Sequence, residues 1–336
     1  MSEQENYLVV GSGNMACRHI QNLKKLFPLS KVGCVPSTEK KRTPQSVGAD
    51  VIYLDLTEAI VDNPLFAVIA NPAPFHLEKA QLLLENNIAV FIEKPLSDGL
   101  ITYKAMGDVF RRHQHRIEMG YNLRYLPSAL FLKKYLTEGL LGNPRSITID
   151  VGQFLPHWRP KTDYRNNVSA QKSLGGGVLL ELSHELDYLT WLFGDFDQVF
   201  CQTSTSGLLD LDVEDVADAI FMRRDGVVVN LHMDLLQHSS TRTCKIIGSL
   251  GTLTWNLIAN SLVMTSPSGE ATLLFENNQY DRNQMYLDEL SRFAKVAKGE
   301  MTPAVSFEQG LKVLAMVDAM KDSSRTQKIV ALKECL

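Results

Sequence analysis

A glycine-rich turn near the start of the chain has the spacing of a phosphate-binding loop. The segment Gly11-Ser12-Gly13-Asn14-Met15-Ala16 follows a short apolar run and precedes a helical pattern. In this G-x-G-x-x-A spacing the first glycine permits a tight turn, the second admits a pyrophosphate, and the small last residue lets helix and strand pack closely. The alternative is a purely structural turn. The surrounding strand–helix repeat favours dinucleotide binding by Gly11, Gly13, Asn14, Met15 and Ala16.

The residues after the second expected strand indicate which dinucleotide binds. An Asp or Glu at this place would bind the ribose hydroxyls and select NAD. The sequence has Pro36-Ser37-Thr38-Glu39-Lys40-Lys41-Arg42 instead. Small hydroxyls followed by cations suit a 2′-phosphate. We therefore expect NADP, held by Ser37, Thr38, Lys41 and Arg42, with Glu39 leaving NAD as the alternative.

The elements that must position these residues form two patterns, one on each side of residue 122. Before it, apolar runs alternate with helical stretches such as 75–86 and 100–113, which indicates a parallel sheet with helices on both faces. After it, a helix over 127–138 leads to long alternations separated by turns, which indicates an open, mostly antiparallel sheet. We expect an α/β chain: an N-terminal Rossmann domain with a doubly wound parallel sheet over 1–122, and a C-terminal α+β domain over 123–336.

Individual strands and helices can be placed from the same patterns. The strands expected in the first domain are Tyr7–Val10, Lys31–Val35, Val51–Leu54, Phe66–Ala70, Ala89–Ile92 and Ile117–Tyr121. Those expected in the second are Ser146–Phe154, Gln198–Thr205, Ala217–Met222, Val227–Leu236, Thr243–Ile247, Gly251–Asn256, Ser261–Thr265 and Ala271–Phe275. Helices are expected to close the chain over Met285–Lys298 and Phe307–Ser323.

Composition excludes several other classes of protein. The 336 residues favour two domains. A net charge of −4 gives no basic surface for nucleic acid or membrane. The five cysteines are scattered, so neither a disulfide framework nor a metal site is expected. With no signal peptide or membrane span in the pattern, we expect a cytoplasmic enzyme.

Four further segments resemble one known family. They are Ala70-Asn71-Pro72-Ala73-Pro74-Phe75-His76, Val90-Phe91-Ile92-Glu93-Lys94-Pro95, Gly120-Tyr121-Asn122-Leu123-Arg124-Tyr125, and the run from Gly175 to Asp187. Together they resemble the Gfo/Idh/MocA oxidoreductases, named for glucose–fructose oxidoreductase and inositol dehydrogenase. The segment from Met285 to Phe293 also resembles this family, so the resemblance spans nearly the whole chain.

The resemblance implies a catalytic lysine at Lys94. Ligands bind outside the carboxyl ends of parallel strands, where a Lys can hydrogen-bond a substrate oxygen and exchange its proton while hydride moves at the neighbouring carbon. The resemblance places Asn71, Pro72, His76 and Glu93 around the cofactor. The alternative for Lys94 is an ordinary surface charge.

The run after the glycine triplet supplies a second candidate group. Leu179, Leu182, Leu186 and Leu189 have the spacing of a helix face in the core, and Glu181, His184 and Tyr188 fall on another face of the same helix. A carboxylate near His184 can orient it for acid–base work. The family commonly has an Asp four residues before this His, whereas here Glu181 precedes it by three, which puts its role in doubt. Asp187 fits the family's His-x-x-Asp and is expected at the substrate, or bound only to nearby structure.

The expected substrate is a sugar-type alcohol or ketone. Aromatic and arginine side chains suit a sugar with acidic substituents, because Arg binds carboxylate or phosphate in bidentate fashion. Resemblance to members with such a loop points to a surface-polysaccharide sugar or a nucleotide-linked sugar, the alternative being a surface loop. The residues expected to bind it are Lys94, Tyr121, Asn122, Arg124, Trp158, Arg159, Tyr164, Arg165, His184 and Asp187.

Two other functions stay open at this point. One is a sugar hydrolase or epimerase that oxidises its substrate transiently with bound NAD. The other is a regulator that binds dinucleotide without turnover, against which Lys94 and His184 weigh. The large open sheet of the second domain has a face that the expected helices are too few to cover. We therefore expect a second copy of the chain to pack on it, in a homodimer or homotetramer.

Overall fold

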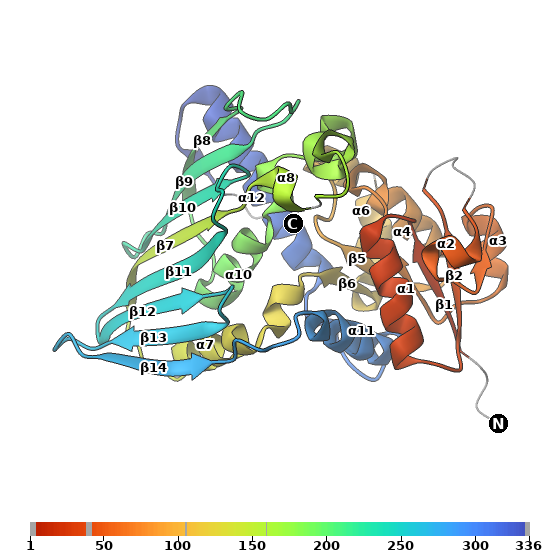
Figure 1. Ribbon diagram of the computed structural model, residues 1–336, viewed down its shortest axis with the longest axis horizontal. Helices are drawn as coiled ribbons and strands as arrows, with labels where there is room; N and C mark the ends of the chain where they lie inside the picture. Colours follow the sequence, from red (N-terminus) through yellow and green to blue (C-terminus); the bar gives the residue numbers. More distant parts are fainter. Residues whose placement is uncertain (1–4, 38–41, 105, 159, 333–336) are drawn as a thin grey trace. The chain divides into compact units, whose positions relative to one another are not determined.

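The computed structural model describes residues 5–37, 42–104, 106–158 and 160–332 (Figure 1). Contacts divide the chain into two units. The first holds Met1–Asn122 and Arg282–Leu314, and the second holds Leu123–Asp281 and Ala315–Leu336. The sequence pattern predicts residues 282–314 in the second domain, whereas their contacts group them with the first.

The first unit is built on a six-stranded sheet in the order β3-β2-β1-β4-β5-β6. Every neighbouring pair is parallel, so the predicted Rossmann-type sheet is confirmed. Its central strands β1, β4 and β5 are buried along nearly their whole length, as expected when helices cover both faces. The strands are β1 (Asn6–Val10), β2 (Lys31–Val35), β3 (Val51–Ile52), β4 (Phe66–Ile69), β5 (Ala89–Glu93) and β6 (Ile117–Gly120).

Helices of this unit follow the strands along the chain, and one more returns from the C-terminal part. They are α1 (Asn14–Leu26), α2 (Pro44–Val47), α3 (Leu56–Val61), α4 (His76–Glu85), α5 (Leu100–Lys104), α6 (Gly107–His113) and α11 (Asn283–Ala297). The single helix expected over 100–113 is two helices. The helix α11 packs onto the sheet through Phe293, whose ring centroid lies 5.0 Å from that of Phe66 and 5.6 Å from that of Phe91. This aromatic contact explains why the segment joins the first unit.

The second unit is built on a nine-stranded sheet in the order β14-β13-β12-β11-β7-β10-β9-β8-β15. Only β7 and β10 run parallel, and the other described pairs are antiparallel. The predicted mostly antiparallel sheet is therefore confirmed. Its strands are β7 (Pro144–Gly152), β8 (Gln198–Ser204), β9 (Val216–Met222), β10 (Val228–Asp234), β11 (Thr241–Gly248), β12 (Gly251–Asn256), β13 (Ser261–Thr265), β14 (Ala271–Glu276) and β15 (Val330–Ala331).

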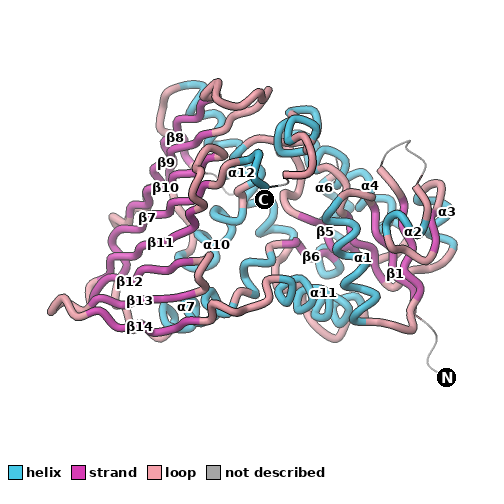
Figure 2. Tube along the Cα trace, viewed as in Figure 1, coloured by secondary structure: helices cyan, strands magenta, loops and turns pink. Residues whose placement is uncertain are grey.

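Within the described part of the chain, helices cover one face of this sheet and leave the other open. Figures 1 and 2 show α7 (Pro127–Thr137), α10 (His184–Phe193) and the later part of α12 (Phe307–Thr326) on the same side. Alternate residues of β9 and β10 are buried beneath them, which is the two-residue period of a half-covered sheet. On the open face Ile220, Ile247 and Leu273 are 40%, 41% and 56% exposed. Among the described residues, no helix is both long enough and apolar enough to cross a membrane.

Candidate active site

The turn after β1 requires glycine at its first position. Gly11 has φ +126°, and a Cβ there would lie 2.6 Å from the carbonyl oxygen of Ala70. Its N–H donates to the carbonyl of Val35 at 2.8 Å, which ties the turn to the end of β2. Any side chain would force apart the ends of β1 and β4, so the local fold excludes every other residue here.

Two residues on, Gly13 lies in a different environment. It is the exposed N-cap of α1, and a Cβ added to it would meet nothing within 4 Å. Asn14 beside it is exposed, Met15 is half-buried and Ala16 is fully buried against the strand. The first turn of α1 holds no acidic residue. Open space at the positive end of a helix fits a dinucleotide pyrophosphate, so the residues present fit the expected cofactor.

The residues expected to select NADP are only partly described. Thr38 and Lys41 lie outside the described residues, while Ser37 follows the end of β2 and Arg42 is exposed. Burial raises the pKa of the Cys34 thiol, in β2, to about 12. The positive charge of Arg42 acts on this pKa in the opposite direction. A cation therefore lies near the end of β2.

The loop after β4 is tied to the loop after β5 by His76. This side chain is buried, with Nδ1 2.9 Å from the Pro95 carbonyl oxygen and Nε2 2.7 Å from that of Asn71. Burial lowers the pKa of His76, which favours the neutral ring, and a neutral ring donates to only one of these carbonyls. The side-chain oxygen of Asn71 is buried without a hydrogen-bond partner among the described residues, so it is available to a ligand. Contact of Asn71, Pro72 or His76 with a cofactor stays a prediction.

Glu93, the last residue of β5, holds the start of the lysine loop. Its Oε1 lies 2.6 Å from Nε2 of the fully buried His19, and its Oε2 accepts from the Lys94 N–H at 3.2 Å. The Lys94 side chain is half-buried, whereas Pro95 and Leu96 after it are buried. Lys94 is thus carried by a loop fixed on both sides, as a proton-transfer group requires.

The second unit places His184 at the first position of α10, after a break in the helix. The sequence analysis expected one continuous helix carrying Glu181, His184 and Tyr188 on one face. The structure corrects this: α9 (Val178–Glu181) ends before α10 begins. Tyr188 is fully buried, and its ring packs edge-on against Trp255 with centroids 5.2 Å apart. The expected core leucines are buried on both sides of the break, so the apolar pattern fits one helix or two.

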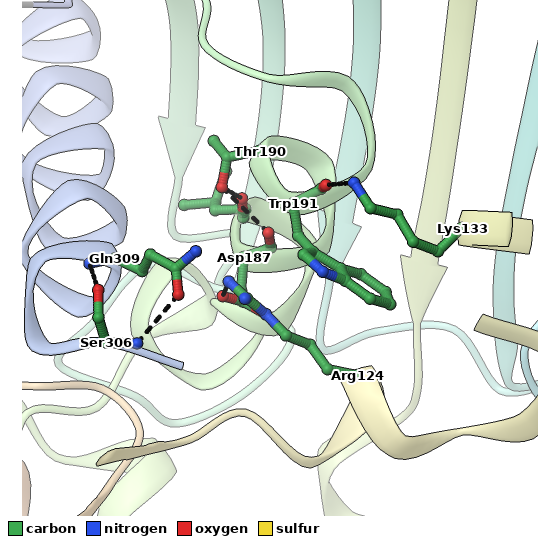
Figure 3. A network of polar contacts seen from close by, with 8 residues as sticks. Arg124, Lys133, Asp187, Thr190, Trp191, Ser306 and Gln309 are labelled. Atoms are coloured by element: carbon green, nitrogen blue, oxygen red, sulfur yellow. Dashed lines mark hydrogen bonds and ion pairs between the residues drawn. The ribbon is translucent and has the colours of Figure 1, made fainter. Parts of the chain in front are cut away.

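Two buried arginine–carboxylate pairs hold α10. Arg124 donates twice to Asp187, at 2.9 and 2.6 Å, and both side chains are nearly inaccessible (Figure 3). Burial raises the pKa of Asp187, while Arg124 acts in the opposite direction. Arg242 of β11 pairs in the same way with the fully buried Glu185, at 2.7 and 2.9 Å. Carboxylates one residue on either side of Leu186 are therefore anchored to two different elements.

The Trp191 ring of α10 lies between two cations. The Arg124 guanidinium carbon is 5.5 Å from the ring centroid and the Lys133 Nζ is 5.6 Å from it (Figure 3). Lys133 also donates to the Trp191 carbonyl at 2.6 Å. Burial, and the nearby charge of Arg124, lower the pKa of Lys133. These contacts fix the far end of the helix that starts at His184.

The other residues expected at the substrate are placed as follows. Tyr121 and Asn122 are buried at the end of β6. The half-buried Trp158 donates from its ring to the Gln153 carbonyl at 3.2 Å, and Tyr164 Oη accepts from the Asp210 N–H at 3.2 Å. Arg159 lies outside the described residues.

Arg165, expected to bind an acidic group, already binds one within its own loop. Its guanidinium donates to both oxygens of Asp163, at 2.7 and 2.9 Å, and lies 3.6 Å from an oxygen of Asp210. Asp163 raises the pKa of Arg165, and Arg165 lowers the pKa of Asp163. A substrate carboxylate would therefore compete with Asp163 for Arg165, whose Nε and Nη2 donors are already occupied.

Sequence reasoning missed Glu185, Arg242 and His19. A signal existed for His19, which lies three residues after Ala16 on the helix face that also carries the buried Ile20 and Leu23. Such a polar residue on an apolar face predicts a buried partner. No local pattern pairs Glu185 with Arg242, because they are 57 residues apart.

Comparison with known proteins gives matches over both units. Residues 5–121 match the model described as "Oxidoreductase family, NAD-binding Rossmann fold", and residues 133–332 match "Oxidoreductase family, C-terminal alpha/beta domain", the two parts of the Gfo/Idh/MocA family. The chain is 26% identical to the myo-inositol 2-dehydrogenase of Thermotoga maritima, with 98% of each chain covered.

Solved structures match the fold along the same length. Levoglucosan dehydrogenase in complex with NADH and L-sorbose has a TM-score of 0.86 at 20% identity, with 98% of this chain and 99% of that chain covered. The WlbA dehydrogenase of Bordetella pertussis in complex with NADH and UDP-GlcNAcA has a TM-score of 0.82 at 17% identity, with 99% of each chain covered.

Removing one partner of the buried Arg124–Asp187 pair should destabilise the second unit strongly. We expect Arg124→Met to lower the free energy of unfolding by about 3–5 kcal/mol, because it leaves a buried carboxylate uncompensated. The double variant Arg124→Met/Asp187→Leu should lose less than Arg124→Met alone. Denaturant unfolding of the three proteins measures this.

The exposed pair Arg165–Asp163 is the matched control. Arg165→Met should change the free energy of unfolding little, since solvent screens the interaction. Equal losses at the buried and exposed sites, or strictly additive losses in the double variant, would contradict the role given to the buried pair.

Proposed function

Because the chain belongs to the Gfo/Idh/MocA oxidoreductase family, we propose that it transfers hydride between a nicotinamide dinucleotide and a hydroxyl-bearing carbon of a sugar or polyol. The observation that carries this proposal is the placement of Lys94. Lys94 follows β5 and the glycine turn follows β1, on either side of β4 in one parallel sheet. Ligands of such sheets bind beyond the carboxyl ends of the strands.

The chain's own residues would handle the proton of this reaction. The bound dinucleotide supplies the acceptor for hydride. Lys94 accepts the hydroxyl proton of the substrate as its carbon is oxidised, and returns it in the reverse direction. A lysine can do this at neutral pH because, unlike arginine, it exchanges its proton readily. Glu93 and His76 hold the lysine loop in place.

In the second unit we assign proton exchange to His184, with Glu181 orienting it. The charged groups of Arg124 and Asp187 bind one another. We therefore propose that this pair acts on the substrate mainly by fixing α10, with His184 at its start. Tyr121, Asn122, Trp158 and Tyr164 would supply the remaining contacts to substrate hydroxyls and ring faces.

For the substrate we favour a neutral ring over an acidic one. Relatives named for inositol and levoglucosan support a neutral polyol, and Asp163 already occupies the Arg165 guanidinium. A nucleotide-linked or surface-polysaccharide sugar is the second candidate, favoured by the complex of WlbA with UDP-GlcNAcA.

The assembly and location of the enzyme follow from the second sheet and the composition. We propose a homodimer or homotetramer that covers the open face carrying Ile220, Ile247 and Leu273. The cytoplasm is the compartment we assign, because the cysteines described in the structure are unpaired thiols.

Cofactor choice can be decided directly. With Pro36 and Ser37 where an acidic residue would select NAD, and Arg42 near the end of β2, we propose tighter binding of NADPH than of NADH. Dissociation constants of the two cofactors measured by fluorescence titration should favour NADPH. Equal constants, or tighter NADH, would refute this preference.

Gly13→Asp should abolish cofactor binding and leave the fold intact. Because a Cβ at Gly13 meets nothing within 4 Å, thermal stability without cofactor should match the parent protein. The added carboxylate would occupy and repel the pyrophosphate position. Gly13→Ala is the uncharged control and should weaken binding less. Unchanged cofactor affinity in Gly13→Asp would remove the turn from the binding site.

Lys94→Ala should lower turnover by about 10²–10⁴-fold, the usual effect of losing a positioned acid–base group. Lys94→Arg should also be slow, because arginine does not exchange its proton at neutral pH. The measurement is steady-state turnover with the best sugar or polyol from a panel, with Lys79→Ala on α4 as the unaffected control. Near-normal turnover of Lys94→Ala with cofactor still bound would overturn the mechanism.

A further inference from the structure

A cluster of buried acids lies beneath the end of β5, entirely within the first unit. Phe91 and Glu118 are register partners on β5 and β6, and Glu93 follows Phe91 by two residues. Their side chains therefore share one face of the sheet. The helices α1 and α11 cover this face, since His19 and Phe293 contact the Phe91 ring with centroids 5.8 and 5.6 Å away.

Glu289 enters this cluster from α11. It lies one turn before Phe293, so the two side chains point the same way. Glu289 is 1% exposed, and neither of its carboxyl oxygens has a hydrogen-bond partner among the described residues. An ionised carboxylate in such a place would lack both water and a counter-charge, and such groups take up a proton instead.

The charges around Glu289 also favour its protonated form. Burial raises its pKa well above the ordinary value, and the negative charges of Glu93, Glu118 and Asp288 raise it further. On the neighbouring helix, His19 already binds Glu93, and the Arg18 guanidinium carbon lies 4.7 Å from the Tyr286 ring centroid.

The remaining element against α11 is the short turn Gln114–Arg116, which carries His115 and Arg116. His115 is exposed and Arg116 half-buried. Neither forms an ion pair with Glu289 among the described residues, so they do not replace the missing counter-charge.

We propose that Glu289 is a positioning residue that holds a proton inside this cluster, so that Glu93 stays a carboxylate bound to His19 and to the Lys94 amide. Acids that share a buried site cannot all ionise, because each new charge repels the others. Both carboxyl oxygens of Glu93 have partners, His19 and the Lys94 amide, whereas neither oxygen of Glu289 has one among the described residues. Ionisation of Glu289 places a second negative charge beneath the lysine loop. The connection to catalysis rests on the function proposed for Lys94.

Unfolding as a function of pH tests the protonation state without any substrate. A carboxyl whose folded-state pKa is raised contributes stability that is present at low pH and is lost as the pH rises through that pKa. The urea midpoint of the parent protein should therefore fall relative to that of Glu289→Gln as the pH rises from the ordinary carboxyl value of 4.5 towards the raised pKa of the folded state. Glu300→Gln, which removes an exposed carboxylate beyond the end of α11, is the matched control and should follow the parent.

Three results would overturn the proposal. One is a difference between Glu289→Gln and the parent that does not change with pH. Another is a Gln variant that becomes relatively less stable at alkaline pH, which would mean that an ionised Glu289 stabilises the fold. The third is failure of Glu289→Gln to fold, because an amide of the same shape should replace a neutral acid.

Kinetics then tests the positioning role. In the parent enzyme kcat/KM should fall on the alkaline side by up to about tenfold per pH unit, the limit for one ionising group. Glu289→Gln should lose or shift this limb, with little change near neutral pH. An alkaline limb identical in both proteins would make Glu289 purely structural. If no sugar or polyol is turned over at all, the proposed function fails while the unfolding result on Glu289 still stands.

Discussion

A negative charge buried at the end of β5 is the constraint on which the first unit depends. Glu93 has to leave water because α1 and α11 cover its face of the sheet, and it does so by binding His19 at 2.6 Å and the Lys94 amide at 3.2 Å. A buried charge of this kind persists only when it is fully partnered. The same contacts fix the direction in which the chain leaves the sheet, and with it the base of the Lys94 side chain.

The second unit meets the same requirement on α10. Glu185 and Asp187 are buried, and each binds an arginine in bidentate fashion, one from β11 and one from the turn that starts the unit. Such pairs add little net stability, because desolvation offsets their attraction, but they are costly to break. They therefore specify one position for the helix that begins at His184. In both units the proposed acid–base group is adjacent to a buried charge, and the paired charges define where it sits.

Much of this arrangement can be predicted from the sequence, because it depends on local patterns of residues. Strand and helix periods locate every described strand but β15 and most of the longer helices, and the glycine turn is marked by Gly11, where a side chain would clash with Ala70. Long-range pairings are not visible: α11 joins the first unit through Phe293 on Phe66 and Phe91, far away in the chain. The break between Glu181 and His184 cannot be predicted for another reason, because leucines buried on both sides of it keep a continuous helical period. The neutralisation of Arg165 by Asp163 likewise depends on a loop conformation that composition does not encode.

The central claim is that the glycine turn and the lysine loop serve one bound dinucleotide. A crystal structure of the full chain grown with NADPH or NADH tests it most directly. The account predicts pyrophosphate oxygens within hydrogen-bond distance of the N–H groups at Gly13 and Asn14, with the nicotinamide ring on the side of the sheet edge where Lys94 lies. A dinucleotide bound elsewhere, or one whose nicotinamide points away from the end of β5, would contradict it.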